Sequence, residues 1–184
     1  MKIVCLGDSL TYGYGIPRKD CWVSVSAQRT GFELVNRGIN GDTTGGMLAR
    51  FREQVLAAQP RRVMLLGGAN DILTSGTDLN ASSNLAAMVY QAVDAGVTPM
   101  VGLYPPYLPA LADPLKLPVL IEEDLTPVFA AYRDWCIRLA QRKGVQVVDF
   151  AQGFTGPDCY QDDVHPNVKG HGIMASVFCA AVQK

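Results

Sequence analysis

The sequence predicts a three-layer α/β/α sandwich around a five-stranded parallel sheet. Five short apolar runs alternate with segments of helical periodicity from one end of the chain to the other, which is the pattern of βα repeats. The runs are apolar at successive positions, as parallel strands are when helices cover both faces of their sheet. A chain of 184 residues fits one core, so residues 1–184 are expected to form a single domain.

Each element is bounded by a recognisable signal. The strands are expected at residues 3–6, 32–35, 63–66, 98–103 and 145–150. Apolar residues at helical spacing predict helices at residues 44–58, 82–95, 120–142 and 167–182. Three of these helices should end where Pro60, Gly96 and Gly144 follow, because proline cannot continue a helix and glycine often terminates one.

One segment, residues 104–118, differs in composition from the rest of the chain. It contains five prolines among several leucines, so we expect a loop rather than a helix or strand. The loop leaves the carboxyl end of the fourth strand, the edge at which open parallel sheets bind ligands. Two interpretations stay open from the sequence: a mobile apolar wall over a binding cleft, or a rigid connector packed on the surface.

Composition and charge argue against several classes of protein. The formal net charge is -1 and no run of Lys or Arg stands out, so nucleic acid is not an expected partner. No apolar run approaches the roughly 18 residues of a membrane span, and the apolar start of the chain is too short for a secretory signal. We therefore expect no stable membrane insertion. The expected location is the cytoplasm, or the periplasm or exterior if a leader was removed.

The five cysteines indicate free thiols in packed positions. Their number is odd, they are widely spaced and they form no C-x-x-C pair, so neither a disulfide framework nor a zinc site is indicated. Three of them lie within strand or helix patterns, where cysteine packs as a small apolar residue. No metal and no organic cofactor is expected. The cysteines are Cys5, Cys21, Cys136, Cys159 and Cys179.

Two histidines are available as a general base, and their surroundings differ. His165 lies in the segment DDVHP, residues 162–166, where Asp162, three residues earlier, can accept its ring N–H. Such an acceptor fixes the tautomer of the imidazole and stabilises the imidazolium that forms when the ring takes a proton. A surface ion pair at the start of a helix is the other interpretation. His171 is expected on the surface of the last helix.

Ser9 lies where the first strand gives way to a helix, a position that exposes a side chain at the edge of a parallel sheet. The segment GDSL, residues 7–10, supplies a glycine for a sharp turn directly after the strand. A serine at this place can act as a nucleophile when a base is near, or it can simply cap the helix. The chain lacks a G-x-S-x-G motif, which argues against an ordinary α/β-hydrolase.

Two loops, after the second and third strands, contain groups that can donate to an oxyanion. Gly41 lies in the first loop, and its missing Cβ would let its amide approach a substrate closely. Asn70 lies just past the third strand and carries a side-chain amide. Taken singly, each loop is also typical of a turn or a helix cap. Both loops are expected at the same edge of the sheet as Ser9.

Four blocks in order along the chain resemble those of the SGNH (GDSL-type) hydrolase family: GDSL at 7–10, GDT at 41–43, GAND at 68–71 and DDVHP at 162–166. The resemblance covers about residues 3–170 and is nearest to bacterial lysophospholipase, thioesterase and arylesterase members. It implies the sheet order 2-1-3-4-5. It implies that Ser9 is the nucleophile and that His165, oriented by Asp162, is the base. The oxyanion would then accept the backbone amides of Ser9 and Gly41 and the side-chain amide of Asn70.

The activity implied is that of a serine esterase, which hydrolyses small carboxylic esters or thioesters through an acyl-enzyme. Leucines within residues 103–117 favour apolar acyl chains, as in a lipase, lysophospholipase or arylesterase. A carbohydrate O-acetylesterase would share the catalytic groups, and four tyrosines could stack on its sugar: Tyr12, Tyr14, Tyr104 and Tyr107. Outside catalysis, the architecture also fits a flavodoxin-like binding module, although the carboxylate of Asp8 would repel a phosphate in the first turn.

The remaining conspicuous residues are expected to be structural. We expect Asp8, Asp42 and Asp71 to cap helices or accept loop amides rather than take part in the chemistry. Trp22 and Trp135 are expected to pack rather than to bind substrate. The sequence leaves the oligomeric state and the preferred ester open.

Overall fold

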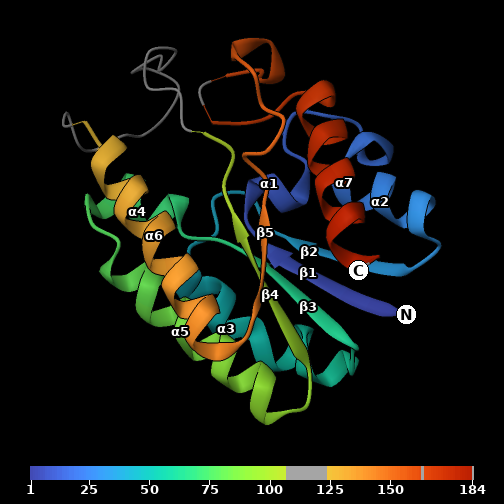
Figure 1. Cartoon of the computed structure of the whole chain (residues 1–184), viewed down its shortest axis with the longest axis vertical. Coiled ribbons are helices and arrows are strands. Elements are labelled where there is room, and N and C mark those ends of the chain that lie inside the picture. Colours follow the sequence, from blue (N-terminus) through green and yellow to red (C-terminus); the bar gives the residue numbers. More distant parts are fainter. Residues whose placement is uncertain (107–123, 163, 184) are drawn as a thin grey trace.

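The computed structural model describes residues 1–106, 124–162 and 164–183. Its five strands form one parallel sheet in the order β2-β1-β3-β4-β5 (Figure 1), which confirms the predicted fold class. The strands are β1 (Lys2–Gly7), β2 (Glu33–Gly38), β3 (Arg62–Leu66), β4 (Thr98–Leu103) and β5 (Gln146–Asp149). The helices are α1 (Ser9–Tyr12), α2 (Trp22–Thr30), α3 (Thr44–Gln54), α4 (Ala69–Ser75), α5 (Leu79–Asp94), α6 (Thr126–Lys143) and α7 (Val168–Val182).

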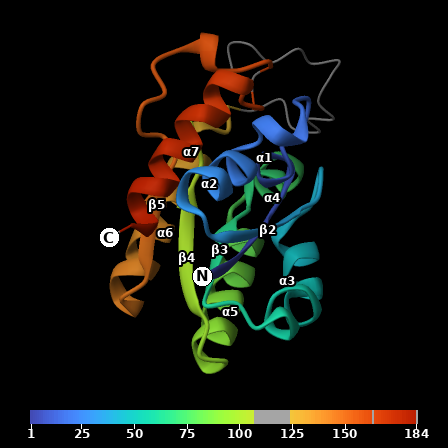
Figure 2. The same cartoon turned by 90° about the vertical axis from the view of Figure 1, so that its right-hand side faces the viewer.

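Alternate residues of each strand point into two separate apolar layers. On one face of the sheet, residues such as Val4 and Leu65 pack with α3, α5 and α6. On the other face, Cys5 and Met64 pack with α2 and α7. Figure 1 shows the two groups of helices on opposite sides of the sheet, and α2 and α7 face the viewer in Figure 2. Because both faces are covered, the strands are apolar at successive positions rather than at every second one.

The long helices were placed correctly by the apolar spacing, but their ends differ. The predicted helix 44–58 is divided, since α3 ends at Gln54 and a 3₁₀ turn, Leu56–Ala58, follows it. α5 begins at Leu79, three residues before the predicted start. α6 begins at Thr126 with a proline in its first turn, where proline is favoured. Residues 120–123 of that predicted helix lie outside the described residues.

Three shorter helices have no clear signal in the sequence pattern. α1 has 4 residues and α4 has 7, and each ends at a glycine in the left-handed conformation. Segments this short do not establish a 3.6-residue period. α2 buries Trp22, Val23 and Ser26, but its serines and β-branched residues have weak helix propensity. Packing against the sheet and α7, rather than local preference, therefore stabilises this helix.

His171 lies inside the molecule, which corrects the prediction of a surface position. The residue is 1% exposed, and its Nδ1 accepts the backbone N–H of Trp22 at 3.3 Å. It therefore joins α7 to α2 within one layer of helices. Burial, assisted by the nearby ring of His165, lowers the pKa of His171 to about 4. The imidazole is neutral near pH 7, as its role as an acceptor requires.

The packing predicted for cysteine and tryptophan is confirmed. All five cysteines are buried and free. Trp22 is fully buried, with its ring centroid 5.2 Å from that of Phe150 and 5.1 Å from that of Phe178. Trp135 lies partly buried against the opposite layer. Residues 107–118 of the predicted proline-rich loop lie outside the described residues, so both interpretations of that loop stay predictions.

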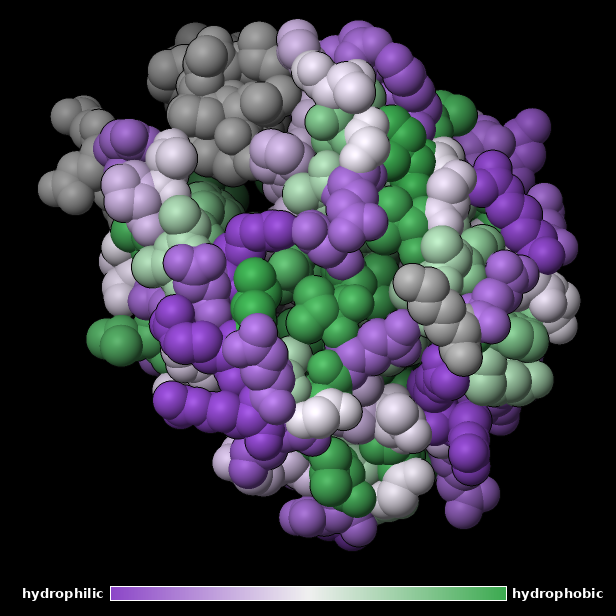
Figure 3. Space-filling model, in the orientation of Figure 1, coloured by the Kyte–Doolittle hydropathy of each residue, from purple (hydrophilic) through white to green (hydrophobic). Residues whose placement is uncertain are grey.

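The surface around the edge strand β5 combines apolar and polar side chains. Figure 3 shows apolar side chains at the centre of this face, between α6 and α7, with polar side chains around them.

Within residues 1–106, 124–162 and 164–183, none of the helices has the length and apolar character that crossing a membrane requires.

Candidate active site

Ser9 is the first residue of α1, at the edge where the carboxyl ends of the strands meet (Figure 1). The carboxylate of Asp8 caps this helix by accepting the backbone N–H of Leu10 at 2.9 Å. Ser9 is 6% exposed. Its backbone amide lies in the first turn of a helix, where amides have no acceptor within the helix itself. The amide is therefore able to donate to a group outside α1.

His165 reaches Ser9 from the loop that connects β5 to α7. Its Nε2 lies 3.0 Å from Ser9 Oγ, and its Nδ1 lies 2.8 Å from Asp162 Oδ2. The backbone N–H of Gln161 donates to the carbonyl of His165 at 3.0 Å, which closes the loop that carries Asp162 and His165. The structure thus brings together the three residues that the sequence singled out from opposite ends of the chain.

The loop holds Asp162 as a carboxylate. Its Oδ1 accepts the backbone N–H groups of Val164 at 2.9 Å and His165 at 2.6 Å. Partial burial acts to raise the pKa of Asp162, but these amides and the His165 ring outweigh it, and the pKa lies below its usual value. A carboxylate facing Nδ1 keeps the proton on that nitrogen, so Nε2 faces the Ser9 hydroxyl as an acceptor.

The loops after β2 and β3 are joined by the side chain of Asn70. Its Nδ2 donates to the carbonyl of Asp42 at 2.8 Å, and no acceptor for the second N–H of the amide is found in the part of the chain that the structure describes. Gly41 has a φ of 73°, a left-handed conformation that glycine adopts without strain. Apart from Gly41 itself and its two chain neighbours, no heavy atom of the described residues lies within 4 Å of the place where a Cβ on Gly41 would be. The loop is therefore open on that side.

A buried carboxylate fixes the helix that carries Asn70. Asp71 accepts the backbone N–H of Thr44 at 2.8 Å through Oδ2 and the Thr44 hydroxyl at 2.7 Å through Oδ1. The same hydroxyl accepts a hydrogen bond from Asn84 Nδ2 at 3.1 Å. The predicted structural role of Asp71, to cap a helix or accept loop amides, is confirmed, since Asp71 accepts the first backbone N–H of α3. The network ties α4 to the start of α3.

Asp8 has a partner that the sequence did not indicate. The hydroxyl of Tyr104, just after β4, donates to Asp8 Oδ2 and accepts the backbone N–H of Ala69 at 3.3 Å. Burial raises the pKa of the Asp8 carboxyl to about 6, although the hydrogen bond from Tyr104 acts to lower it. The contact joins the turn before Ser9 to the ends of β3 and β4. Nothing local marks it, because the partners lie 96 positions apart.

Asp42 was predicted to cap a helix or accept a loop amide, and the structure gives its carboxylate a different role. It forms an ion pair with Arg50 of α3 at 2.6 Å, and each side chain is 12% exposed. The cap of α3 comes instead from Thr43, whose hydroxyl accepts the backbone N–H of Gly46 at 3.3 Å. Thr43 rather than Asp42 occupies the cap position of α3, so the Asp42 carboxylate is left to pair with Arg50.

The tyrosines considered for a sugar platform lie in different places. The ring of Tyr14 lies against that of His165, with centroids 4.5 Å apart and planes at 41°, and Tyr14 is 45% exposed. Tyr12 lies under an arginine guanidinium, 4.2 Å from the ring centroid, and the hydroxyl of Tyr104 is turned to a buried carboxylate. Tyr107 lies outside the described residues. Tyr14 alone, of the three that are described, has a ring contact with His165.

The side chains gathered at this edge are suited to acyl transfer. A hydroxyl, an imidazole and a carboxylate form a hydrogen-bonded row, and amide groups of two neighbouring loops lie at the same edge. In the part of the chain that the structure describes, no three His, Cys, Asp or Glu side chains form a group able to hold a metal ion.

Curated proteins similar in sequence include ester hydrolases. The chain is 34% identical over 100 residues to an arylesterase of Vibrio mimicus, a match that covers 52% of this chain and 50% of that protein. A longer match, 25% identical over 186 residues, is to thioesterase 1/protease 1/lysophospholipase L1 of Escherichia coli and covers 98% of this chain and 83% of that protein. At 30% identity or more, the chain spans about half the length of the curated relatives it matches.

A solved structure and a family model each match nearly the whole chain. A solved member of the lipolytic G-D-S-L family from Veillonella parvula superposes with a TM-score of 0.84 at 22% identity, covering 100% of this chain and 99% of that one. The sequence model of the GDSL-like lipase/acylhydrolase family matches residues 5–173. This range contains all four blocks that carried the resemblance. The chain belongs to the GDSL-like lipase/acylhydrolase family.

Proposed function

We propose that this protein is a serine ester hydrolase in which Ser9 is the nucleophile and His165, oriented by Asp162, is the base. The observation that carries the proposal is the row from Ser9 Oγ through the imidazole to the carboxylate, with distances of 3.0 and 2.8 Å. The family, and the ester hydrolases among the relatives, support it. A non-catalytic flavodoxin-like binding module would need no such row.

In the proposed reaction, His165 Nε2 takes the hydroxyl proton as Ser9 Oγ attacks the carbonyl carbon of the ester. The negative oxygen of the tetrahedral intermediate would accept the amides of Ser9 and Gly41 and the side-chain amide of Asn70. The imidazolium, stabilised by Asp162, gives its proton to the leaving alcohol, and an acyl-enzyme remains. Water, activated by the same ring, then releases the acid and restores Ser9.

The test is hydrolysis of p-nitrophenyl acetate, butyrate and octanoate by the wild type and by Ser9→Ala in parallel. We expect turnover by the wild type and almost none by Ser9→Ala. A fluorophosphonate should add covalently to the wild type and not to this variant. Ser176→Ala, at a serine whose hydroxyl bonds Arg29 on the surface at 2.9 Å, is the matched control and should keep full activity. Equal activity of Ser9→Ala and the wild type would contradict the proposal.

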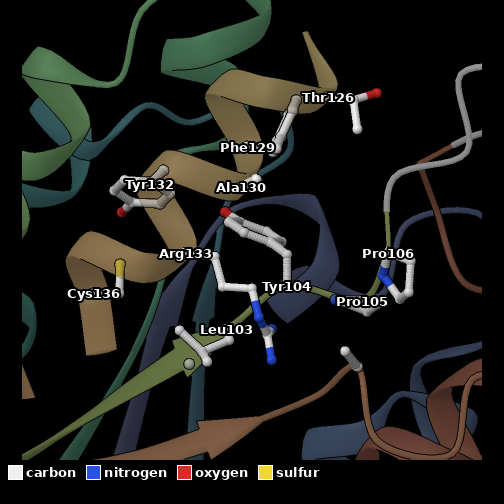
Figure 4. A pocket seen from close by; sticks show the side chains of 12 residues that line it. Leu103, Tyr104, Pro105, Pro106, Thr126, Phe129, Ala130, Tyr132, Arg133 and Cys136 are labelled. Atoms are coloured by element: carbon white, nitrogen blue, oxygen red, sulfur yellow. The ribbon is translucent and has the colours of Figure 1, made fainter. Parts of the chain in front are cut away.

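We propose further that the acyl group is an apolar chain rather than the acetyl group of a sugar. A cavity of about 270 Å³ lies between the end of β4 and α6, with Leu103, Phe129 and Ala130 among its walls (Figure 4). The guanidinium of Arg133 also lines it, but it is paired with Asp149 by bonds of 3.0 and 2.6 Å. The cavity is therefore largely apolar and suits hydrocarbon.

A smaller pocket shares walls with this cavity and is also lined by neighbours of the predicted catalytic residues. It is lined by the sequence neighbours of the nucleophile, the donor and the base: Leu10, Ala69 and Val164. It shares four wall residues with the larger cavity: Tyr104, Pro105, Pro106 and Phe129. An acyl chain on Ser9 would thus have a continuous apolar path into the larger cavity.

Two neighbouring alanines of α6 offer a matched test of this path. Ala130 lines the cavity and Ala131 is exposed and is not among the cavity walls that are described. Ala130→Phe should lower kcat/KM for p-nitrophenyl octanoate by about 10-fold or more and leave the acetate unchanged. Ala131→Phe should change neither. Unchanged octanoate hydrolysis in Ala130→Phe would contradict the acyl path, and a strong preference for acetylated sugars would favour the O-acetylesterase instead.

A further inference from the structure

We infer that Arg50 is a positioning residue for the proposed reaction, which holds the predicted oxyanion donors in place through Asp42 and the end of β1. The inference rests on the proposed function. Arg50 lies in α3, and its side chain is only 12% exposed. An arginine buried to this degree needs partners for its charge and its donors.

Each of the five N–H donors of the Arg50 guanidinium has an acceptor. Nε and one N–H of Nη2 donate to Asp42 Oδ2 at 2.9 and 2.6 Å. The second N–H of Nη2 donates to the carbonyl of Gly7 at 3.0 Å. Nη1 donates to the carbonyl of Arg37 at 2.8 Å and to Gln54 Oε1 at 2.7 Å. Only a guanidinium carries five donors, so no other side chain can make this set of bonds.

Apart from Gln54 of the same helix, the acceptors belong to segments that meet near the nucleophile. Gly7 ends β1, two residues before Ser9, and Arg37 lies in β2. Asp42 lies in the loop between β2 and α3, the loop that carries Gly41. Arg50 therefore fixes the loop after β2 against the strand that presents the nucleophile.

Asp42 connects this position to two of the three predicted donor groups, Gly41 and Asn70. Gly41 precedes it directly, and the carbonyl of Asp42 accepts Asn70 Nδ2 at 2.8 Å. A Cβ on Gly46 would lie 1.9 Å from Asp42 Oδ1, so glycine at that position lets the carboxylate lie directly against α3. The Asp42 carboxylate is thus held between the helix backbone on one side and Arg50 on the other.

The expected kinetic effect follows from what the donors do. An oxyanion is stabilised most by donors that are fixed before its charge develops, and a misplacement of about 1 Å can cost about 100-fold in rate. The neutral ester in the ground state uses these donors much less. Loss of Arg50 should therefore lower kcat and leave KM nearly unchanged.

Arg50→Met and Arg50→Lys test the inference on p-nitrophenyl acetate, at a temperature where both variants are folded. We expect kcat to fall by about 10- to 100-fold with KM within about twofold. Lysine keeps the charge but has three donors, so most of the loss should persist. An alkyl boronic acid, which forms a tetrahedral adduct with a reactive serine, should bind more weakly by the same factor as kcat. The product carboxylate should inhibit as before.

Phe178→Leu controls for stability alone, because Phe178 packs on Trp22 in the opposite layer, at 5.1 Å between centroids. It should lower the midpoint of thermal unfolding without changing kcat. If Arg50→Met does not fold, Arg50→Lys and the isosteric Asp42→Asn carry the test. An unchanged kcat, a rise in KM alone or an unchanged boronic acid Kd would overturn the inference while the proposed function stands. A wild type without Ser9-dependent hydrolysis would overturn both.

Discussion

The two halves of the candidate site are held in different ways. The nucleophile half, at the ends of β1, β2 and β3, is fixed by buried polar side chains, since Asp8 is fully buried and Arg50 uses every donor it has. The base half is a single loop between β5 and α7. In this loop the side chain of Asp162 is 33% exposed. Tyr14, which follows α1 and packs on His165, is 45% exposed.

This difference corresponds to the task of each half in the proposed reaction. Oxyanion donors are most effective when their dipoles are fixed in advance. The base has to exchange protons with the serine, the leaving alcohol and water in turn. A partly exposed loop lets the alcohol leave the imidazole and lets water reach it. We therefore expect substitutions in the first half to act through geometry, and substitutions in the second half to act through proton transfer.

The largest effect is expected where the base half loses its imidazole. His165→Ala should lower kcat by about 10⁶-fold and Asp162→Ala by about 10⁴-fold, because the ring itself moves the proton, whereas the carboxylate orients the ring and stabilises the imidazolium. Both values come from steady-state hydrolysis of p-nitrophenyl butyrate. His171→Gln, at the other histidine, is the control and should keep its activity. If Asp162→Ala cost more than His165→Ala, the assignment of base and orienter would be wrong.

The next largest effect is expected in the nucleophile half. Asn70→Ala should lower kcat by about 100- to 1000-fold, the usual consequence of losing one oxyanion donor, while KM changes little. Asn80→Ala, at an exposed asparagine of α5, should be within about twofold of the wild type. Full turnover by Asn70→Ala would show that the nucleophile half does not stabilise the oxyanion through this side chain.

A smaller effect, on stability, is expected at His171, in the helix that follows the base half. The pKa of His171 is lowered to about 4 in the folded protein, whereas an unfolded histidine titrates near 6.5. Between pH 6.5 and pH 4 the unfolded chain binds a proton at His171 and the native protein does not. The free energy of unfolding therefore falls from its value above pH 6.5 as the pH is lowered to 4. The loss amounts to about 3 kcal/mol.

The measurement compares urea unfolding of the wild type and His171→Gln at pH 7 and pH 4. Glutamine can still accept the Trp22 N–H but does not titrate, so the advantage of the wild type should shrink by about 3 kcal/mol on acidification. The comparison of the two proteins is needed because Asp8, with its pKa raised to about 6, changes stability with pH in the direction opposite to His171. The charged form of Asp8 lowers stability above pH 6, and this destabilisation disappears below pH 4. A constant difference between the two proteins would contradict the lowered pKa of His171.

The fold and the candidate residues could be predicted because both leave local marks in the sequence. Residues 63–66 are apolar throughout and lie between polar or glycine-rich stretches, which identifies a covered strand. Ser9 and His165 lie in short blocks whose neighbours are themselves diagnostic, so each could be proposed without knowing the other's position. The roles assigned to these residues stay predictions until the variants are measured.

Contacts between distant polar residues could not be predicted in the same way. Arg50 resembles any solvated arginine of a helix, because its acceptors are defined only when β1, β2 and α3 pack together. The position of His171 did leave a mark, since it lies three and four residues before Met174 and Ala175 on the buried stripe of α7. A polar residue on an apolar stripe is a candidate for burial with a partner, and here the partner is the backbone of Trp22.

The smallest effect should come from Tyr14, and it tests whether the base half is as loosely held as its exposure indicates. Tyr14→Leu removes the ring that lies 4.5 Å from His165, a contact of a kind that contributes about 0.5–1.5 kcal/mol, so kcat/KM should fall by about 2- to 10-fold. Tyr90→Leu, at a tyrosine that is 48% exposed and lies under Lys143, should have no effect. A loss as large as that of Asn70→Ala would mean that the position of His165 depends on this one ring. The base would then be as strictly positioned as the oxyanion donors, and the contrast between the two halves would fail.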